Sequence, residues 1–251
     1  MHFIGSGALL CHAVEYTLGA GLAVDGVCCA PGDAAIARIR RRGVAVFESA
    51  DPNREWPAQL RTGDDAGDDG IVFSINNKIL LGESLLSCGA RFFNVHAGLV
   101  QRYRGIAEVC IFAALCRGEE RYGATLHQVL PRQKVDAGPV VAQLEFAIGR
   151  KDCFAEVLAH SLETCRTIFE ENVRSVAAGA YEAVPMAPAK AAFTYRDIAW
   201  LAAGADAAHL KRAANLGRYA GFFPELRALV SALRPAAGAE LPPPARSLFS
   251  P

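Results

Sequence analysis

The stretch that most clearly indicates the fold is FFNVHAGLVQRYRG, at residues 92–105. Apolar residues surround Asn94 and lead to His96, a pattern typical of a buried strand. In an extended strand alternate residues share a face, so Asn94 and His96 project to the same side. The glycines and arginines after His96 are typical of a loop. The stretch therefore predicts a strand that brings an amide and an imidazole together at its end.

Around this strand, short apolar runs alternate with amphipathic stretches along most of the chain. This alternation predicts an α/β fold, a doubly wound and mostly parallel Rossmann-like sheet with a short C-terminal appendage. In such sheets ligands bind beyond the carboxyl ends of the strands, where Asn76 and His96 both fall. The expected strands are 2–5, 24–29, 44–47, 70–75, 91–95, 123–129 and 140–146, and the expected main helices are 8–18, 33–42, 107–117 and 153–178.

Changes in composition along the chain predict its division into segments. We expect a catalytic domain at residues 1–179 and a linker rich in alanine and proline at 180–194. A small C-terminal subdomain should follow at 195–240, and the proline-rich end at 241–251 is expected to be a flexible tail. The subdomain is expected to pack beside the acceptor side of the cleft or to form the contact of a homodimer.

The charge balance argues against two classes of partner. The chain has 26 Lys and Arg and 26 Asp and Glu, so its formal net charge is zero. A neutral chain has no general attraction for nucleic acid or for an anionic membrane. The apolar stretch at 8–30 is interrupted by His12, Glu15 and Asp25, so it is not expected to span a membrane. With no signal-peptide pattern at its start, the protein is expected to be cytoplasmic.

The eight cysteines lie within apolar, periodic segments and form no C-x-x-C pair. This spacing predicts reduced and mostly buried thiols, and no metal site is expected. The turn GSGALL at residues 5–10 lacks the third glycine of a dinucleotide fingerprint. It is expected to be a tight strand-to-helix turn, although an anion bound at that helix N-terminus stays an open alternative.

A carboxylate completes a possible catalytic group. Asp136 lies in the turn VDAGP, between two predicted strands. Asn94 and a protonated His96 could donate hydrogen bonds to the oxyanion of a tetrahedral intermediate. Asp136 could fix the tautomer of the imidazole and help to move the proton lost by an attacking amine. From spacing alone this interpretation is weak, because a single histidine on a buried strand is usually a hydrogen-bonded residue of the core.

The sequence NVHAGLVQRYRG, followed some thirty residues later by VDAGPVV, resembles the 10-formyltetrahydrofolate-dependent formyltransferases. The pattern of that family is N-x-H-P-S-L-L-P-x-Y-R-G and then D-x-G-P, and the resemblance extends from the first strand to about residue 178. It implies that Asn94, His96 and Asp136 are the catalytic residues. It also implies a formyl transfer from 10-formyltetrahydrofolate, the co-substrate, to an amine through a tetrahedral intermediate, without a metal.

The resemblance further implies where the pterin ring would bind. The family's I-L-P loop corresponds here to Ile79, Leu80 and Leu81, and the main chain of this loop would read the edge of the pterin. An amphipathic helix start is the alternative interpretation of that segment. The full set of expected folate-binding residues is Asn76, Ile79, Leu80, Leu81, Val135 and Gly138.

The loop after His96 is expected to bind the acceptor, through Gly98, Gln101, Arg102, Tyr103 and Arg104. This loop lacks prolines that the family has, which should leave it less preorganised. His127 matches a strand that the family often writes as G-V-T-x-H, and we interpret it as a structural or supporting residue. His12 and Glu15 are interpreted as an ordinary surface or packing feature of the first helix.

The acceptor is expected to be a small-molecule amine or an aminoacyl group bound to a carrier protein, in secondary metabolism such as antibiotic or siderophore biosynthesis. Methionyl-tRNA is disfavoured by the neutral charge, and glycinamide ribonucleotide by the GSGALL turn. Two other functions stay open. One is hydrolysis of formyltetrahydrofolate, and the other is a folate-binding module without turnover.

Overall fold

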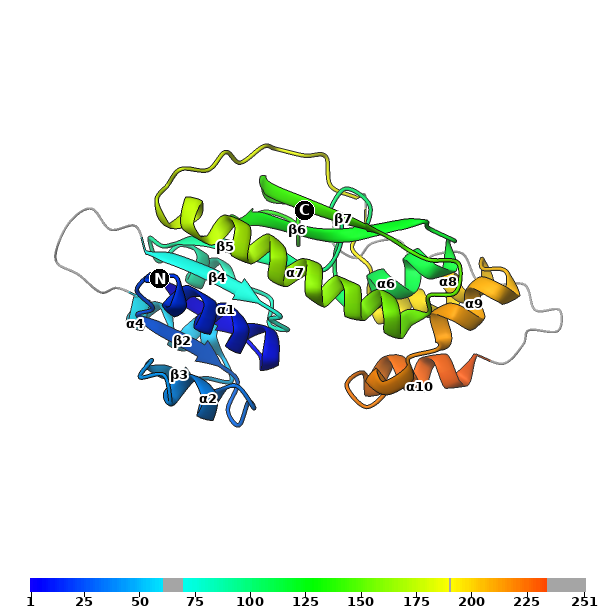
Figure 1. Ribbon diagram of the computed structural model, residues 1–251, viewed down its shortest axis with the longest axis horizontal. Helices are drawn as coiled ribbons and strands as arrows, with labels where there is room; N and C mark the ends of the chain where they lie inside the picture. Colours follow the sequence, from blue (N-terminus) through cyan, green and yellow to red (C-terminus); the bar gives the residue numbers. More distant parts are fainter. Residues whose placement is uncertain (61–69, 190, 234–251) are drawn as a thin grey trace. The chain divides into compact units, whose positions relative to one another are not determined.

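Seven strands form one sheet in the computed structural model, which describes residues 1–60, 70–189 and 191–233 (Figure 1). The order across the sheet is β3-β2-β1-β4-β5-β6-β7. Pairing is parallel from β3 through β5, whereas β5 and β6 are antiparallel. The predicted doubly wound, mostly parallel sheet is thus confirmed. The strands are β1 His2–Gly5, β2 Gly26–Cys29, β3 Val46–Glu48, β4 Ile71–Ile75, β5 Arg91–His96, β6 Arg121–Val129 and β7 Val140–Ala147.

The helices include the three long ones that the periodicity predicts, namely α1 Gly7–Gly19, α6 Ala107–Cys116 and α7 Phe154–Ala177. Two four-residue helices were not predicted, α3 Pro52–Glu55 and α4 Pro57–Leu60, and a third, α5 Glu83–Leu86, lies in the segment for which a helix start was the alternative interpretation. The helix expected at 33–42 is shorter in the structure, where α2 comprises Ile36–Arg40. The remaining helices are α8 Ile198–Ala203, α9 Ala207–Ala214 and α10 Pro224–Ala232, with 3-10 turns at Tyr195–Asp197 and Gly217–Tyr219. No helix in the described ranges is both long and apolar enough to cross a bilayer.

The chain forms two compact units, each assembled from separate segments. Unit 1 comprises residues 1–96, 124–144 and 165–187. Unit 2 comprises residues 97–123 and 145–164, together with the described residues from 188 onward. The boundaries that composition predicts, with a catalytic domain at 1–179, a linker at 180–194 and a C-terminal subdomain at 195–240, stay a prediction. The expected tail at 241–251 lies outside the described residues.

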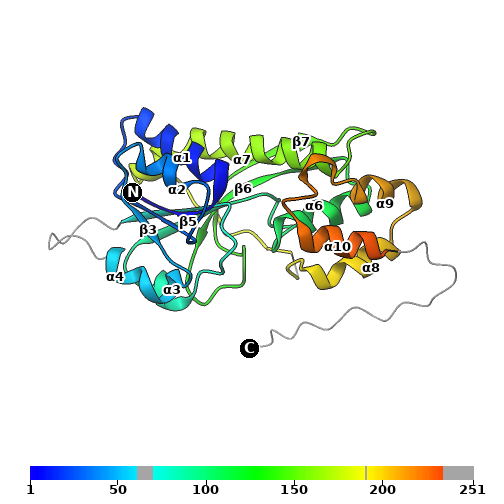
Figure 2. The ribbon, with the colours of Figure 1, turned by 90° about the horizontal axis from the view of Figure 1, so that it is seen from below.

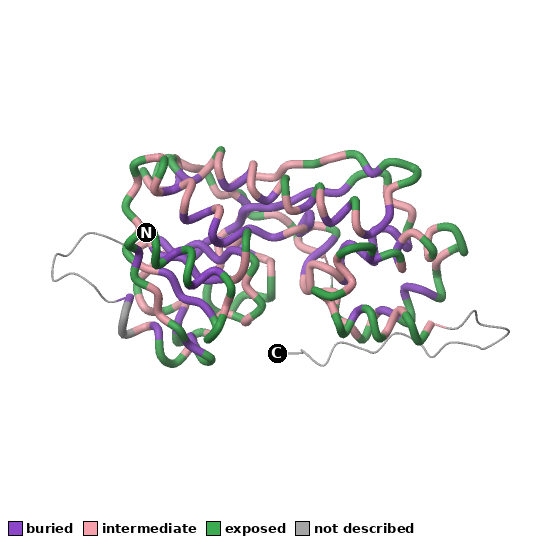
Figure 3. The backbone as a smooth tube through the Cα atoms, turned by 60° about the horizontal axis from the view of Figure 1, so that its bottom comes forward, coloured by how far each residue is buried: buried purple, intermediate pink, exposed green. Residues whose placement is uncertain are grey.

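In unit 1, successive residues of each strand pack on opposite faces of the sheet, as the period of a strand requires. Phe3 and Phe73 lie on one face, with ring centroids 6.0 and 5.1 Å from that of Phe169 in α7. The other face packs against α3, α4 and α5 (Figure 2). Figure 3 colours the buried stretches of the backbone purple, and in unit 1 most residues of β1, β2, β4 and β5 are buried. The cluster on this second face includes Ile4, Val72, Phe92, Trp56, Leu60 and Leu85.

In unit 2, helix α6 is the centre of a separate core. Its residues from Val109 to Cys116 are all buried. The surrounding cluster includes Tyr122 and Phe154, and also Ile198, Leu201 and Leu226 from the C-terminal helices. The C-terminal helices therefore share one core with α6.

All eight cysteines are free, and seven of them are buried, so the prediction of reduced and mostly buried thiols is confirmed. Burial raises the pKa of Cys28 and of Cys29 to about 12. Such thiols stay protonated at neutral pH and are poor nucleophiles.

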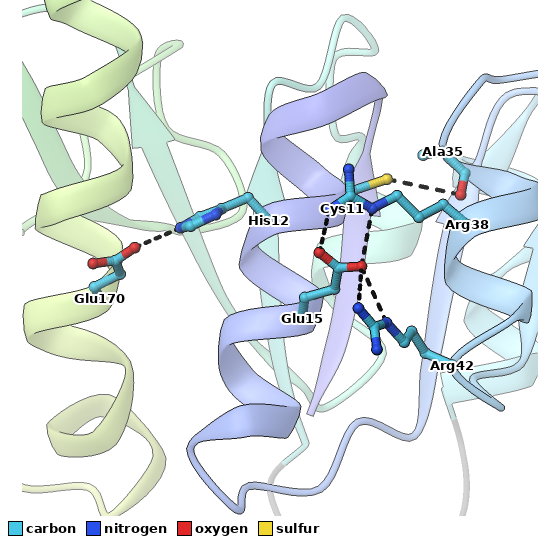
Figure 4. A network of polar contacts seen from close by, with 7 residues as sticks. All are labelled: Cys11, His12, Glu15, Ala35, Arg38, Arg42 and Glu170. Atoms are coloured by element: carbon cyan, nitrogen blue, oxygen red, sulfur yellow. Dashed lines mark hydrogen bonds and ion pairs between the residues drawn. The ribbon is translucent and has the colours of Figure 1, made fainter.

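Polar contacts on α1 attach this helix to its neighbours (Figure 4). His12 contacts Glu170 of α7 through its Nε2 atom. Glu15 accepts hydrogen bonds from the Nε atoms of Arg38 and Arg42, at 2.9 and 3.1 Å. These positions agree with the interpretation of His12 and Glu15 as packing residues. Hydrogen bonds from Arg38, more than those from Arg42, lower the pKa of Glu15 to about 2.

We expect Glu15→Gln to destabilise the fold by about 1 kcal/mol at pH 7, the upper end for ion pairs whose arginines are exposed. Because the folded pKa lies below the ordinary value of about 4.3, the carboxylate stabilises the fold fully above that value. This contribution should disappear as the pH falls from about 4 toward about 2. Urea unfolding of both proteins, from pH 7 down to the lowest pH at which they stay folded, measures it.

The matched control for this prediction is Glu48→Gln. Glu48 pairs with one arginine, Arg40, so its loss should cost less than that of Glu15. A difference between wild type and Glu15→Gln that is the same at pH 7 and at pH 3 would contradict the assignment.

Candidate functional site

The ends of β5 and β6 and the turn after β6 bring four polar side chains together in unit 1. β5 ends at His96, and Asn94 lies two residues earlier on the same face. The antiparallel register places His127 of β6 directly opposite Asn94. Asp136 follows in the turn between β6 and β7. The structure thus brings Asn94, His96 and Asp136 together near the carboxyl end of β5, as the strand and turn predictions imply.

Asp136 contacts both of the other predicted catalytic residues. The Nδ2 atom of Asn94 donates to its Oδ1 atom at 3.3 Å, and Nδ1 of His96 lies 3.5 Å from its Oδ2 atom. Only 5% of the His96 side chain and 10% of the Asp136 side chain are exposed. A carboxylate beside Nδ1 favours a proton on that atom, so a protonated His96 would have its Nε2–H left to donate.

His127, which the sequence analysis interprets as a structural or supporting residue, is the fourth member of this cluster. Its Nε2 atom lies 3.2 Å from Nδ2 of Asn94 and 3.4 Å from Oδ1 of Asp136. Its Nδ1 atom lies 2.8 Å from the carbonyl oxygen of Gln128. Because a carbonyl only accepts, Nδ1 carries the proton, and in the neutral ring Nε2 accepts from Asn94. His127 therefore orients the amide of Asn94. The register that reveals this contact cannot be read from the local sequence.

The backbone of the VDAGP turn has little freedom to move. Asp136 has φ 49°, a left-handed conformation that is uncommon outside glycine, asparagine and aspartate. Gly138 lies against β6 so closely that an added Cβ atom would be 1.8 Å from the carbonyl oxygen of Gln128. The amide of Gln128 also donates to the carbonyl of Pro139 at 2.9 Å. These contacts fix the Asp136 carboxylate beside the end of β5.

The predicted folate-binding loop is a loop at residues 79–82, and α5 begins immediately after it at Glu83. Asn77 holds both main-chain groups of Ile79, since its Oδ1 accepts from the amide and its Nδ2 donates to the carbonyl. Asn53 donates to the carbonyl of Leu80 at 2.9 Å and accepts from the amide of Gly82 at 2.6 Å. Sequence reasoning missed Asn53, because its partners lie 27 and 29 residues away.

Three other predicted folate residues have clear positions in unit 1. Asn76 joins the ends of β4 and β1, because its Nδ2 donates to the Ser6 carbonyl at 3.2 Å and its own carbonyl accepts from Ser6 Oγ. Val135 is 38% exposed and Leu80 is 68% exposed, so both side chains present apolar surface to solvent. Gly138 is buried by the close contact with β6.

The predicted acceptor residues, Gly98 to Arg104, all belong to unit 2. Tyr103 is buried, and its hydroxyl donates to Glu119 at 2.6 Å. Arg102 also contacts Glu119, at 2.6 Å. Arg104 is buried and donates from Nε to the Ala189 carbonyl at 2.6 Å. These three side chains thus bind groups of their own unit, whereas Gly98 is buried and Gln101 is half-buried. Their contact with an acceptor stays a prediction.

The cluster in unit 1 combines an amide donor, an imidazole and a carboxylate at hydrogen-bonding distances. Donors of this kind can stabilise an oxyanion, and the carboxylate can take up a proton. Such a set supports acyl transfer without a covalent intermediate.

Comparison with known proteins agrees with this chemistry. Residues 35–170 match the sequence profile of a family described as formyl transferase. Among solved structures, the chain is similar to an N-formyltransferase from Helicobacter canadensis in complex with folinic acid and dTDP-3-aminofucose. The two share 16% identity over 78% of this chain and 71% of that one, with a TM-score of 0.63.

Two further structures show the same fold. A 4-N formyltransferase from Francisella tularensis shares 14% identity over 79% of this chain and 78% of that one, with a TM-score of 0.63. Glycinamide ribonucleotide transformylase 1 from Symbiobacterium toebii shares 22% identity over 71% of this chain and 87% of that one, with a TM-score of 0.62.

Proposed function

Because this chain belongs to the formyl transferase family, and is an enzyme of that class, we propose that it transfers the formyl group of 10-formyltetrahydrofolate to a primary amine. The observation that supports this reaction is the convergence of Asn94, His96 and Asp136 at the ends of β5 and the β6–β7 turn. We propose these three as the catalytic residues.

In the proposed reaction the amine nitrogen attacks the formyl carbon, and the formyl oxygen becomes an oxyanion. The protonated His96 donates a hydrogen bond to that oxygen, and Asn94 does so with the N–H that lies 3.3 Å from Asp136 in the free protein. Asp136 keeps the proton on Nδ1 of His96 and receives, directly or through water, the proton that the attacking amine loses. The C–N bond to the acceptor forms, the C–N10 bond of the folate breaks, and N10 takes up a proton. The products are an N-formyl amine and tetrahydrofolate.

We propose that the folate binds against the 79–82 loop and the VDAGP turn. Asn53 and Asn77 hold the main chain of that loop in one conformation, which suits a site that reads a pterin through backbone groups. The exposed side chains of Leu80 and Val135 offer apolar surface to a flat ring. Folinic acid is present in the structure of the H. canadensis protein, which makes a folate ligand reasonable for this chain.

The proposed acceptor is a small-molecule amine or a carrier-bound aminoacyl group of secondary metabolism. The amino-sugar ligand of the H. canadensis protein makes amino sugars the first class to test. The test incubates the chain with 10-formyltetrahydrofolate and a panel of amines, including amino sugars, hydroxylated ornithine and glycinamide ribonucleotide. Formate released equally fast without an amine would indicate a hydrolase. Absence of both products would contradict the proposed reaction.

We expect 5-formyltetrahydrofolate to raise the melting temperature and NAD to leave it unchanged. A ligand that binds only the folded state stabilises it by about 2.7 kcal/mol at a hundred times its Kd. Differential scanning fluorimetry over a range of concentrations measures the shift. A shift with NAD and none with the folate would show that the ligand class is wrong.

A further inference from the structure

Unit 1 contains a cavity of about 210 Å³ where its sheet changes direction. From β1 the chain moves outward to β2 and β3, and it then returns to the other side of β1 as β4. In open α/β sheets, ligands bind in the crevice beyond the carboxyl ends of the strands at such a point. The wall of the cavity includes Gly5, Ser6, Cys29, Asp33, Lys78 and Ile79.

The cavity lies close to the proposed reaction in the same unit. β4 is hydrogen-bonded to β5, whose end carries Asn94 and His96. Ile79, in the proposed folate-binding loop, forms part of the cavity wall. A ligand in the cavity would thus lie one strand away from the strand that carries Asn94 and His96.

An internal carboxylate occupies the place at this cavity where an anion would normally bind. Helix α1 begins at Gly7, directly after the turn that follows β1, and such an N-terminus ordinarily attracts phosphate or carboxylate. Here Oδ1 of Asp33 accepts from the amide of Gly7 at 3.0 Å and from the amide of Ala35 at 2.8 Å. A phosphate at the same place would meet a like charge.

Asp33 also has an oxygen to offer a ligand. Within the described part of the chain, Oδ2 of Asp33 receives no hydrogen bond. Lys78 supplies the ammonium group among the described lining residues, but it is exposed to solvent. Two amides fix the Asp33 carboxylate, whereas the lysine is solvated on a flexible stem. The cavity therefore favours hydrogen-bond donors over anions beside α1.

We propose that this cavity binds the body of the amine acceptor, that Asp33 accepts hydrogen bonds from its hydroxyl or ammonium groups, and that Asp33 excludes acceptors with a phosphate at this position. Asp33 is then a residue that determines acceptor specificity. The proposal rests on the proposed formyl transfer for the identity of the ligand. The exclusion of phosphate can be tested without turnover.

The first test measures binding of inorganic phosphate by calorimetry and by thermal shift. Wild type should bind no phosphate in a saturable way. Asp33→Asn removes the charge but keeps the shape, and Asp33→Ser also vacates the place. Each variant should bind phosphate in a saturable way, with a Kd at least about tenfold below the highest phosphate concentration at which wild type shows no binding. Asp33→Ser should bind phosphate more tightly than Asp33→Asn. Glu48→Gln, which removes a carboxylate outside the cavity wall, should behave as wild type. Circular dichroism and folate binding confirm that each variant is folded.

The second test uses whichever amine of the panel is formylated. Asp33→Asn should raise its KM about tenfold and change kcat little, because the lost contact holds the acceptor and not the reacting atoms. Phosphate binding to wild type as tight as to Asp33→Ser would overturn the exclusion, and so would a folded Asp33→Ser that gains no binding. An unchanged KM would overturn the acceptor contact. If no amine is formylated, the proposed function fails, and the phosphate measurement still decides the role of Asp33.

Discussion

Asp136→Asn should lower the rate of formyl transfer by about three to four orders of magnitude, by analogy with other Asp–His pairs in enzymes. The substitution keeps the shape of the side chain that lies 3.5 Å from Nδ1 of His96. It removes the negative charge beside Nδ1 of His96 and the carboxylate that takes up the proton of the amine. His96→Ala should be similarly severe, and Asn94→Ala should cost about two to three orders of magnitude, as loss of one oxyanion donor does.

The combination of variants makes this prediction specific. If His96 and Asp136 act as one unit, the double variant should be hardly slower than the worse single variant. Folate affinity should stay nearly unchanged in all of them, because the proposed folate contacts are main-chain groups and apolar side chains. Asp25→Asn, at an exposed carboxylate paired with the chain's amino terminus, is the control. Near-normal turnover in Asp136→Asn, or losses that multiply in the double variant, would mean that the site is misassigned.

The main elements of the fold follow from sequence periodicity because they are long or fully buried. Helix α7 and the strands at the centre of the sheet begin and end close to the predicted residues. The four-residue helices α3 and α4 were missed, and α5 was expected only as an alternative, for a physical reason. A single turn is unstable by itself, and here Trp56, Leu60 and Leu85 hold these turns in place through packing with the sheet.

The meeting of Asn94, His96 and Asp136 follows from two local facts of the sequence, the end of a strand and the turn at Asp136, whereas their catalytic role was implied only by the resemblance to the formyltransferases. The contacts around it depend on pairings that the sequence does not reveal. His127 meets Asn94 only through the antiparallel register of β5 and β6. Asn53 and Asp33 act on main-chain groups of segments 26 to 29 residues away. Such residues can be found only once the strand order is known.

The second large effect should come from Gly138→Ala. An added Cβ atom would lie 1.8 Å from the carbonyl oxygen of Gln128, so either the VDAGP turn or the end of β6 must move. Because Asp136 precedes Gly138 by two residues, its carboxylate would move with the turn. A displacement of about 1 Å in a catalytic group can cost about a hundredfold in rate. We therefore expect turnover to fall by about two orders of magnitude, and the fold to lose about 2–4 kcal/mol through strain against the strand.

Gly19→Ala separates this steric effect from a general effect of removing a glycine. Gly19 ends α1, and nothing lies within 4 Å of the position that its Cβ would take. This control should leave turnover unchanged and the stability equal or slightly higher, because alanine restricts the unfolded chain. Urea unfolding and initial rates of formyl transfer, measured on both variants, make the comparison. Normal turnover with normal stability in Gly138→Ala would mean that the turn can relax without moving Asp136. The rigidity of the turn could then no longer explain how the carboxylate is held beside His96.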